Sequence, residues 1–531
     1  MTRAGGRPLW GAALLAAFAL VYAAWPSWDW YFDGLVFAGA VEHATGRGDA
    51  GLLFHPHHLL YCPIAWLAYR ATLATGLVVR AWFVQQMLSV ACAVATLAVF
   101  RRLARRVGVS PTLADAGTVT LGACYIFWHF ASQGDTTMPS TLLQVIVMNR
   151  LAAVAERPRP REAVILGLLL AFAFLVHQSA AVFVPAAAWI LLRSGAARAR
   201  LRNTVLCLGI AGAGVVGGYV GACVWGLGLR DPAAMLAWLH GYVGTDPLTG
   251  YAQHYGRWAP ESVLVSGRAF CEAFVGPAAD GSPGRLVAAG FGLAALALTA
   301  GGGLRARWAK LAPARRTFLQ GLALALGTHA VFFTWWSVGH TRYWTSVLPG
   351  WILLLELGIA GRQGRGTPIL RPAAVAWGLA GIVVVAVVAG PLRREVQPSY
   401  NRFITVAERI SAATRSDSLV IVSGFGEYNS LKAYVSYVSR RYLMVLDWRF
   451  ADRSVPVATT VARLRTYLVL ASRERPVYVL SEALDPSLDE HFAKALGVTP
   501  ELRRAVFAPF RLRPAADLAP GLVLLRLEPR R

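Results

Sequence analysis

The sequence is poor in charge, and poorest in acidic side chains. Charged residues fill only 15% of its 531 positions, with 28 Asp and Glu against 52 Lys and Arg. A soluble chain carries about 25% charged residues. Together with a hydrophobic content of 56%, this excludes a disordered chain and most soluble enzymes. The net charge of +24 could suggest a nucleic-acid partner, but a basic soluble domain would lack long apolar runs.

Cysteine and nucleotide-binding motifs are also scarce. The six cysteines are scattered and show no CxxC or Cys/His zinc spacing, which excludes a disulfide framework. There is no P-loop, no glycine-rich dinucleotide motif after a strand and no internal repeat. An enzyme driven by ATP or by a nucleotide sugar would need such a domain, so we expect neither.

Apolar runs near twenty residues are abundant in the first three quarters of the chain. A bilayer core of roughly 30 Å needs about 20 helical residues to cross it. We predict about eleven spans, near 9–25, 81–100, 113–130, 138–155, 163–176, 179–193, 204–226, 285–304, 317–336, 344–361 and 372–391. A twelfth run at 59–75 contains Pro63 and Arg70, and we interpret it as an interfacial helix.

The loops between these spans predict the topology. Alternate loops carry 22 Lys and Arg but only three acids, which is typical of cytoplasmic loops. The N-terminus is then cytoplasmic, and residues 1–25 form an uncleaved first span, because no small-residue cleavage pattern follows them. Spans 163–176 and 179–193 meet at an outer His177-Gln178 turn; the alternative is one long kinked helix.

The composition changes near residue 392, so we predict two domains, a transmembrane domain at 1–391 and an extracytoplasmic domain at 392–531. Strand-like runs at 418–423, 442–446 and 477–480 alternate with helical patterns in the second domain. This alternation predicts a small α/β domain with a mostly parallel sheet. Its 22 Lys and Arg exceed its 14 acids, which favours a solvated basic surface over a binding face for anionic headgroups.

The first outer loop contains the most informative acids. Asp29 and Asp33 lie four residues apart among Trp and Tyr side chains, directly after a span. On a helix they would share a face. The aromatic residues are typical of an interfacial belt, but a carboxylate near the bilayer is costly unless it is used. We therefore favour a functional role for Asp33.

Two further outer loops each contain one informative charge. Asp135 is the single charge in a very short turn before Pro139, where it could also cap the next helix. Arg342 is the single cation between Trp336 and Pro349. Its planar guanidinium suits a phosphate, although snorkelling to lipid headgroups is an equal alternative.

Carboxylates, histidines and an arginine on one side of a bilayer fit one reaction well. A sugar carried on a polyprenyl phosphate needs no cytoplasmic nucleotide site. An Arg or His, with or without a divalent cation, would stabilise the departing phosphate. A carboxylate would take the proton of an acceptor hydroxyl.

The order of these parts resembles the GT-C membrane glycosyltransferases, the superfamily of protein O-mannosyltransferases and the lipid A aminoarabinose transferase. The resemblance covers about residues 1–390. It rests on Asp33-Gly34, His55-Pro56-His57-His58-Leu59-Leu60-Tyr61, Leu103-Ala104-Arg105-Arg106, Asp135, and Arg342-Tyr343 with Pro349. Each motif alone is short; their order along the chain and their shared sidedness carry the resemblance.

The resemblance implies roles for these residues. Asp33 would be the catalytic carboxylate, with Asp29 as the fallback, and Asp135 would support the acceptor site. Asp33 and Asp135 would be the ligands of a divalent cation, if one is used. The donor phosphate or sugar would be contacted by His55, His57, His58, His177, Gln178, Arg342 and Tyr343. The chain departs from the family pattern at His57, which replaces a second proline, and at His177-Gln178, where a lysine is common.

The expected partners are a polyprenyl-phosphate-linked sugar, the membrane, and a lipid, glycan or protein acceptor, without nucleic acid. The resemblance also implies inversion at the anomeric carbon and a site at the outer face of the cytoplasmic membrane. Three alternatives stay open: a multi-pass transporter, an O-antigen-ligase or polymerase-like enzyme with a large outer loop near 227–284, and a non-catalytic sensor.

Overall fold

The computed structural model describes residues 7–47, 50–240, 259–277, 301–305, 307–337, 339–361, 371–424, 430–450 and 455–530. The chain forms two compact units, which are described separately. The first comprises Met1–Trp28, Ala40–Met235 and Gly256–Gln397. The second comprises Asp29–Gly39, Leu236–Tyr255 and Pro398–Arg531. The segment that carries Asp29 and Asp33 therefore belongs, by its contacts, to the same unit as the C-terminal sheet.

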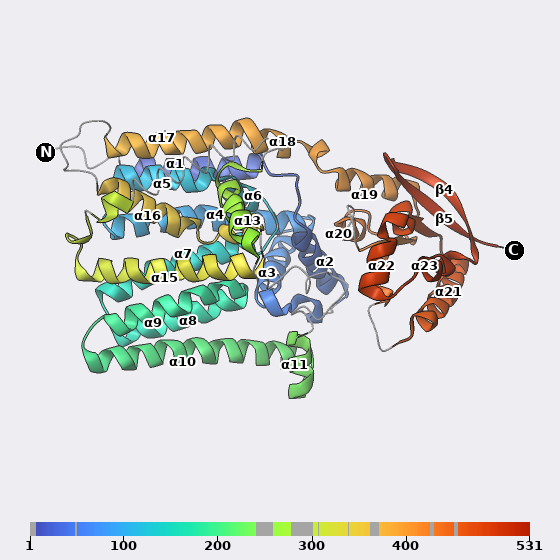
Figure 1. Cartoon of the computed structure of the whole chain (residues 1–531), viewed down its shortest axis with the longest axis horizontal. Coiled ribbons are helices and arrows are strands. Elements are labelled where there is room, and N and C mark those ends of the chain that lie inside the picture. The colour runs from blue at the N-terminus through green and yellow to red at the C-terminus, as the bar shows by residue number, and fades with distance from the viewer. Residues whose placement is uncertain are drawn as a thin grey trace. The chain divides into compact units, whose positions relative to one another are not determined.

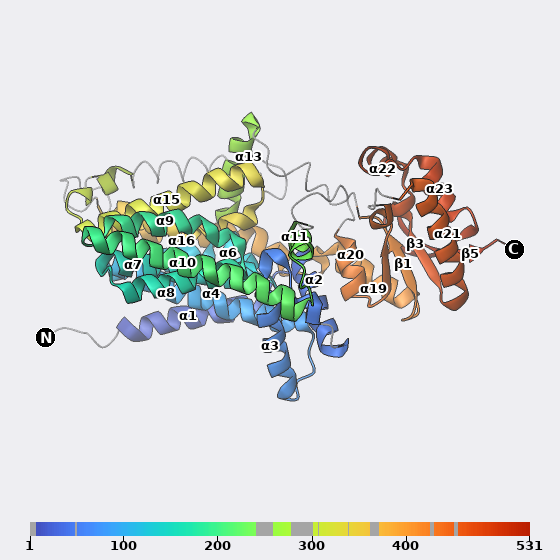
Figure 2. The same cartoon turned by 90° about the horizontal axis from the view of Figure 1, so that it is seen from below.

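The first unit is helical, and its long helices run roughly side by side in both views (Figures 1 and 2). Among the described residues its α-helices are α1 (Arg7–Ala24), α3 (Tyr61–Ala74), α4 (Ala81–Arg106), α5 (Pro111–Ala123), α6 (Tyr125–Ala131), α7 (Thr137–Glu156), α8 (Pro160–Val176), α9 (Phe183–Arg193), α10 (Ala197–Gly221), α13 (Pro260–Val275), α15 (Pro313–Trp336), α16 (Leu348–Ala360), α17 (Pro372–Val387) and α18 (Arg393–Glu395). Helix α2 (Phe32–Arg47) begins in the second unit and ends in the first, and α11 (Pro232–His240) begins in the first and ends in the second.

Helices cover ten of the eleven predicted spans, and the eleventh, near 285–304, lies almost wholly outside the described residues. Among the described residues, five helices are long and apolar enough to cross a membrane: Ala81–Arg106, Thr137–Glu156, Ala197–Gly226, Pro313–Trp336 and Pro372–Glu395. The chain therefore has a multi-pass helical membrane fold, while the count of eleven stays a prediction.

One boundary differs in kind from the prediction, and another confirms it. The span predicted near 113–130 is wrong as a single helix, because Cys124 has an extended backbone (φ −53°, ψ 135°) that separates α5 from α6. Conversely, His177 is extended (φ −159°, ψ 123°), so α8 and α9 are two helices that meet there, as predicted.

Glycines let the first unit's helices approach closely, as small residues do in membranes. Helix α8 packs along α10. A Cβ on Gly167 would lie 2.5 Å from the backbone oxygen of Cys207, and one on Gly214 would lie 2.8 Å from the Cβ of Ala171. On the other face of α10, Val205 and Val216 are exposed, and such apolar side chains are suited to lipid.

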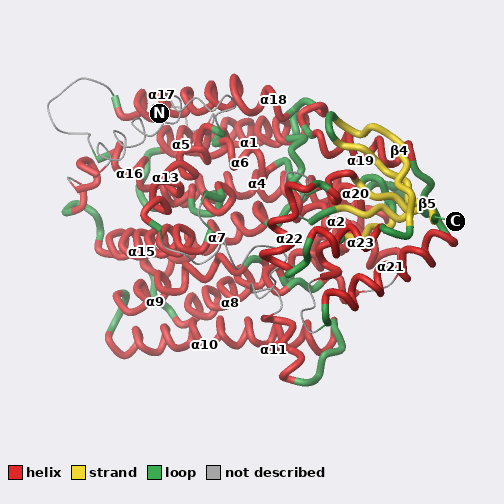
Figure 3. Tube along the Cα trace, turned by 45° about the vertical axis from the view of Figure 1, so that its right-hand side comes forward, coloured by secondary structure: helices red, strands yellow, loops and turns green. Residues whose placement is uncertain are grey.

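The second unit holds the strands, which Figure 3 shows gathered in the C-terminal part of the chain. The sheet order is β2-β1-β3-β5-β4. Strands β1 (Leu419–Val422), β2 (Tyr442–Val445) and β3 (Val477–Leu480) are parallel, whereas β4 (Phe510–Ala519) and β5 (Leu522–Pro529) add an antiparallel hairpin. Helices α19 (Arg402–Ala413), α20 (Leu431–Tyr437), α21 (Val457–Glu474), α22 (Asp489–Leu496) and α23 (Pro500–Phe507) complete the unit.

The parallel strands and four of these helices match the prediction, but the sheet as a whole is mixed. Strands β4 and β5 and helix α23 were not predicted. The sequence of β4, FRLRPAADLA, carries two arginines and Pro514, so it lacks the apolar run of a buried strand. Proline and charge are typical of an edge strand, and β4 lies at the sheet edge.

Two acids meet at the carboxyl ends of the parallel strands. Asp447 accepts hydrogen bonds from the hydroxyl of Ser423 and the backbone N–H of Gly424, and Glu482 Oε1 accepts the N–H of Ser423 at 2.9 Å. Glu482 Oε2 is shielded from solvent and has no hydrogen-bond partner in the part of the chain that the structure describes. Burial raises the pKa of Asp447 to about 6 and that of Glu482 to about 8.

These raised values predict a pH dependence of stability. The unfolded acid ionises near its ordinary pKa, about 4.3 for Glu, while the folded Glu482 stays protonated up to about pH 8. Its contribution to stability is therefore fully present below the unfolded pKa and is lost as the pH rises through 8. Glu482→Gln, which keeps the acceptor for Ser423, should slow hydrogen exchange in β1 and β3 at pH 8 and change little at pH 4. Glu490→Gln, at an exposed ion pair with Lys494, is the control; equal effects of both variants would contradict the prediction.

Candidate active site

A short buried turn between α6 and α7 holds Asp135. The carboxylate Oδ1 accepts the hydroxyls of Thr136 and Thr137 at 2.9 and 3.0 Å and the backbone N–H of Thr137 at 2.9 Å. Asp135 is fully buried. The carboxylate thus satisfies free N–H and O–H groups at the start of α7, as expected of a residue near a helix N-terminus. Its other oxygen, Oδ2, has no hydrogen-bond partner in the described residues.

Arg342 lies against this turn. It belongs to a short 3-10 helix, η5 (Thr341–Trp344), between α15 and α16. Its Nη2 lies 3.4 Å from Asp135 Oδ1 and donates to the Thr136 hydroxyl at 3.1 Å. Arg342 as a whole is only 8% exposed. A buried ion pair adds little to stability, because removing both charges from water is costly. The fixed position of Arg342 is therefore a reason to look for a functional role.

Four histidines form a cluster near Arg342. His57 and His58 lie on the 3-10 helix η2 (Pro56–His58), which His55 precedes. The ring centroids of His55 and His58 are 5.4 Å apart, and those of His58 and His177 are 4.6 Å apart. The predicted donor-binding histidines, which come from two distant parts of the sequence, are therefore brought together.

Burial and mutual repulsion keep three of these histidines, His55, His58 and His177, uncharged. Burial and then His57 lower the pKa of His55 to about 3. The pKa values of His58 and His177 are also lowered, first by burial and then by neighbouring charges that include Arg342. Neutral imidazoles beside a fixed guanidinium form a positive site in which each ring can still donate one N–H.

Two predicted donor contacts have other partners in the structure. The amide of Gln178 donates to the backbone oxygen of Pro56 at 3.2 Å and to the Tyr219 hydroxyl at 2.9 Å, so it holds the histidine segment in place. The Tyr343 ring stacks on Phe333 with centroids 4.3 Å apart. Gln178 therefore anchors this site, and Tyr343 packs beside Arg342.

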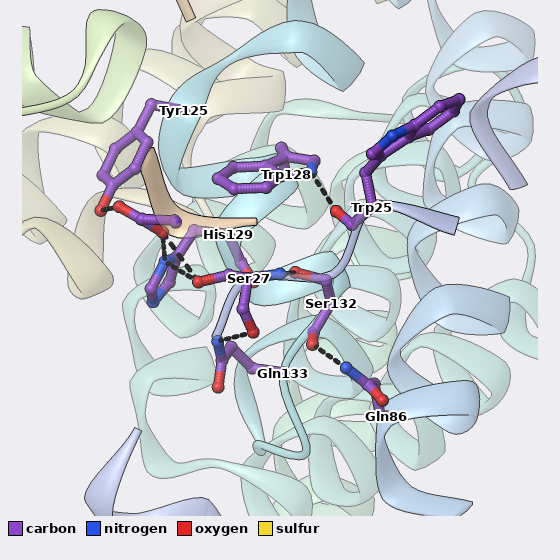
Figure 4. A network of polar contacts seen from close by, with 9 residues as sticks. Trp25, Ser27, Gln86, Tyr125, Trp128, His129, Ser132 and Gln133 are labelled. Carbon is purple, nitrogen blue, oxygen red and sulfur yellow. Dashed lines mark hydrogen bonds and ion pairs between the residues drawn. The ribbon is translucent and has the colours of Figure 1, made fainter. Parts of the chain in front are cut away.

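A buried polar network connects the Asp135 turn with Ser27, which follows α1, and with Glu395, the last residue of α18 (Figure 4). Glu395, after the last span, accepts hydrogen bonds from Ser27 at 2.8 Å and Tyr125 at 2.8 Å, and its Oε2 lies 2.9 Å from His129 Nδ1. The Ser27 N–H donates to the Ser132 hydroxyl at 3.0 Å. The network thus joins the start of the loop after α1, α6 and the turn that leads to Asp135.

Glu395→Ala should destabilise the first unit by about 3–5 kcal/mol, the usual cost of breaking a buried ionic pair. It removes the acceptor that Ser27, Tyr125 and His129 share. Tyr125→Phe removes one donor only and should cost about 1 kcal/mol. The check is the free energy of unfolding in mixed micelles. A Glu395→Ala protein as stable as Tyr125→Phe would contradict the network's importance.

The first-loop acids lie in the second unit. Asp33 is in the first turn of α2, where a negative charge interacts favourably with the positive end of the helix dipole. Asp29 precedes this helix, so the expectation that the two acids share a helix face is wrong. The C-terminal part of the unit holds this segment: the Tyr434 hydroxyl donates to the backbone oxygen of Trp30, and the Lys432 ammonium lies 5.2 Å from the centre of the Phe32 ring.

The surroundings of Asp135 are poor for a divalent cation. Three donors and Arg342 already engage Oδ1, which leaves one oxygen for a metal that prefers several. The Arg342 charge would also repel a cation. Asp33 belongs to the other unit, so a cation bound by both acids stays a prediction.

Several buried polar residues around the site were missed from the sequence. These are Gln85, beside the Asp135 turn, and Gln86, His129, Ser132 and Glu395, whose hydrogen bonds support that turn from outside the site. A signal was present for the first two, because a Gln-Gln pair in the first half of an otherwise apolar span is unusual and often functional. No sequence pattern pairs His129 with Glu395, since 266 positions separate them.

Comparisons with known proteins match this chain at the level of structure. No family model and no curated protein sequence matches it. The crystal structure of ArnT from Cupriavidus metallidurans bound to undecaprenyl phosphate covers 99% of this chain and 98% of its own, with a TM-score of 0.56 and 15% identity. Its apo state gives 0.57 and 14% over the same shares.

The Pmt1-Pmt2 protein O-mannosyltransferase complex of S. cerevisiae, bound to its sugar donor, covers 41% of this chain and 34% of its own, at 14% identity and a TM-score of 0.32. That match is too weak to carry an argument. The ArnT match spans both units and nearly every residue. The chain therefore has the fold of ArnT, and the resemblance to the GT-C membrane glycosyltransferases is confirmed at the level of the fold.

Proposed function

We propose that this chain transfers a sugar from a polyprenyl-phosphate donor to a cell-envelope hydroxyl at the outer face of the cytoplasmic membrane. One observation carries the proposal. A fixed, buried arginine lies beside a cluster of neutral histidines, in the fold of a protein that was crystallised with undecaprenyl phosphate. Arg342 and the histidines suit a phosphate ester, and the apolar helices around them suit its lipid tail.

The donor phosphate would be held by Arg342, His55, His57, His58 and His177. During transfer the bond between the anomeric carbon and the phosphate oxygen breaks, and its electron pair leaves with the phosphate. A second negative charge then develops on that group. The guanidinium and the imidazole N–H groups stabilise this charge in a place with little water.

Asp33 would accept the proton of the acceptor hydroxyl as that oxygen attacks the anomeric carbon. The second unit would support this step through Tyr434 and Lys432, which contact the segment that carries Asp33. Asp29 is the fallback base. The outer location of these residues follows from the charge of the loops.

One observation favours the alternative that the chain is a multi-pass transporter. Glu356 lies fully buried in α16, and neither of its oxygens has a hydrogen-bond partner among the described residues. Transport sites place such acids in broken helices at mid-membrane, but α16 is continuous around Glu356. The large loop near 227–284 of the ligase-like alternative is described only at 227–240 and 259–277, and nothing there tests that alternative.

The most informative experiment is deletion of the gene, followed by mass spectrometry of the cell-envelope glycans. The proposal expects a glycan or lipid that lacks one sugar, restored by the wild-type gene. This result identifies both the sugar and the acceptor. Unchanged glycans together with lost uptake of a soluble solute would favour the transporter.

A further inference from the structure

Gln85 on α4 is a buried polar side chain with unused hydrogen-bonding groups. It is 1% exposed, and neither its amide nitrogen nor its amide oxygen has a hydrogen-bond partner in the described part of the chain. The neighbouring side chain of Gln86 is also buried. Unlike Gln85, it has a hydrogen-bond partner, because its amide nitrogen donates to the backbone oxygen of Ser132 at 2.7 Å. Leaving an amide buried and unpaired destabilises the folded state, so Gln85 calls for an explanation.

Gln85 lies beside the Asp135 turn. A Cβ on Gly134 would lie 3.2 Å from Gln85 Oε1 and 3.0 Å from Cε3 of the Trp82 indole. Ser89, one turn further along α4, donates to the backbone oxygen of Asp135 at 3.5 Å. The Gln85 amide and the unpartnered Oδ2 of Asp135 therefore border the same short turn, and glycine at position 134 leaves room for the amide.

The charges around this turn restrict what could bind there. Next to the unpartnered Oδ2, the Asp135 carboxylate repels an anion, and Arg342, 3.4 Å from Oδ1, repels a cation. A neutral ligand with both hydrogen-bond donors and acceptors fits this place. The Gln85 amide has an NH2 group that donates and a carbonyl oxygen that accepts, and Asp135 Oδ2 also accepts. The Trp82 ring adds an apolar wall, and aromatic walls with a few polar groups are typical of small-molecule sites. Sugar hydroxyls have this chemistry.

We propose that Gln85, Asp135 Oδ2 and Trp82 form a subsite that binds the hydroxyls of the donor sugar. The inference rests on the proposed function, because it requires the donor phosphate at Arg342. A sugar is joined to its phosphate through one oxygen, so a phosphate on Arg342 places the sugar next to the residue that pairs with that arginine. Gln85 then selects the sugar by hydrogen bonds to its hydroxyls, whereas Arg342 binds the phosphate.

The test compares Gln85→Leu with Gln86→Leu, two substitutions of the same kind at adjacent positions of one helix. Gln85→Leu removes unpaired polar atoms at nearly constant volume, so the thermal midpoint should stay equal or rise. The same variant should bind undecaprenyl phosphate as the wild type does. It should turn over the preferred undecaprenyl-phosphate sugar, chosen from a panel of hexose and pentose donors, with a kcat/KM lower by about 10–100-fold, the range for a lost hydrogen bond in a buried site.

Gln86→Leu should show the opposite pattern, with a lower midpoint and an unchanged kcat/KM in the folded fraction. The inference is overturned if Gln85→Leu keeps the wild-type kcat/KM, since a bridging water would then explain the unpaired atoms. It is also overturned if Gln85→Leu unfolds earlier, as Gln86→Leu does, or weakens the binding of undecaprenyl phosphate itself. A wild-type protein that turns over no donor in the panel overturns the proposed function and this inference together.

Discussion

Asp33→Asn should lower kcat by about 10²–10⁴-fold, the usual contribution of a general base, and leave the KM for the donor nearly unchanged. Asparagine is close to isosteric but cannot accept the proton of the acceptor hydroxyl. The measurement is the rate of sugar transfer in membranes supplied with the polyprenyl-linked donor.

The matched control is Asp29→Asn, which changes an exposed acid of the same segment. Asp29→Asn should retain most of the activity if Asp33 is the base. Full activity of Asp33→Asn would disprove the assigned mechanism. Loss of activity in Asp29→Asn alone would transfer the role to the fallback residue. Loss in both would point to the segment's position, which Tyr434 and Lys432 help to fix.

Arg342→Ala should weaken binding of undecaprenyl phosphate by about 100-fold or more, because a charge-assisted bond to a phosphate contributes about 1.5–3 kcal/mol and the variant also leaves Asp135 buried without its counter-charge. Arg342→Lys keeps the charge but loses the planar fork, so it should restore binding only in part. The measurement is lipid binding by native mass spectrometry.

Arg415→Ala is the control for this second prediction, because Arg415 forms an exposed ion pair with Asp417 in the C-terminal unit. Exposed pairs contribute little, so this variant should bind lipid as the wild type does. Arg342→Ala with unchanged lipid binding would show that the guanidinium does not hold the phosphate. A double variant, Arg342→Ala with Asp135→Asn, separates lost recognition from the cost of the unpaired acid.

Much of the fold could be predicted because its signals are local. Apolar runs set helices such as α4, α7 and α15, and alternating strand and helix patterns set β1, β2 and β3. The break at Cys124 could not be predicted, since the residues around it are as apolar as those of a continuous span. Strand β4 was missed because an edge strand needs no apolar run.

The candidate site was predictable where one residue type carries the signal alone. Asp135, Arg342 and the histidines of the loop between α2 and α3 stand out as polar residues between apolar runs, and the structure brings them into one region. Partners that depend on the tertiary fold could not be found in this way. The contact of Glu395 with His129, and the place of the Asp33 segment beside α20, require the folded chain.

The central claim is that the chain cleaves a polyprenyl-phosphate sugar and passes the sugar to an envelope acceptor. The most direct measurement incubates the purified protein with the donor whose sugar is missing in the deletion strain, together with membranes of that strain, and follows the release of polyprenyl phosphate. The account predicts release that matches sugar incorporation and that is lost in both Asp33→Asn and Arg342→Ala. Release that is absent in the wild type, or that persists in Arg342→Ala, would contradict it.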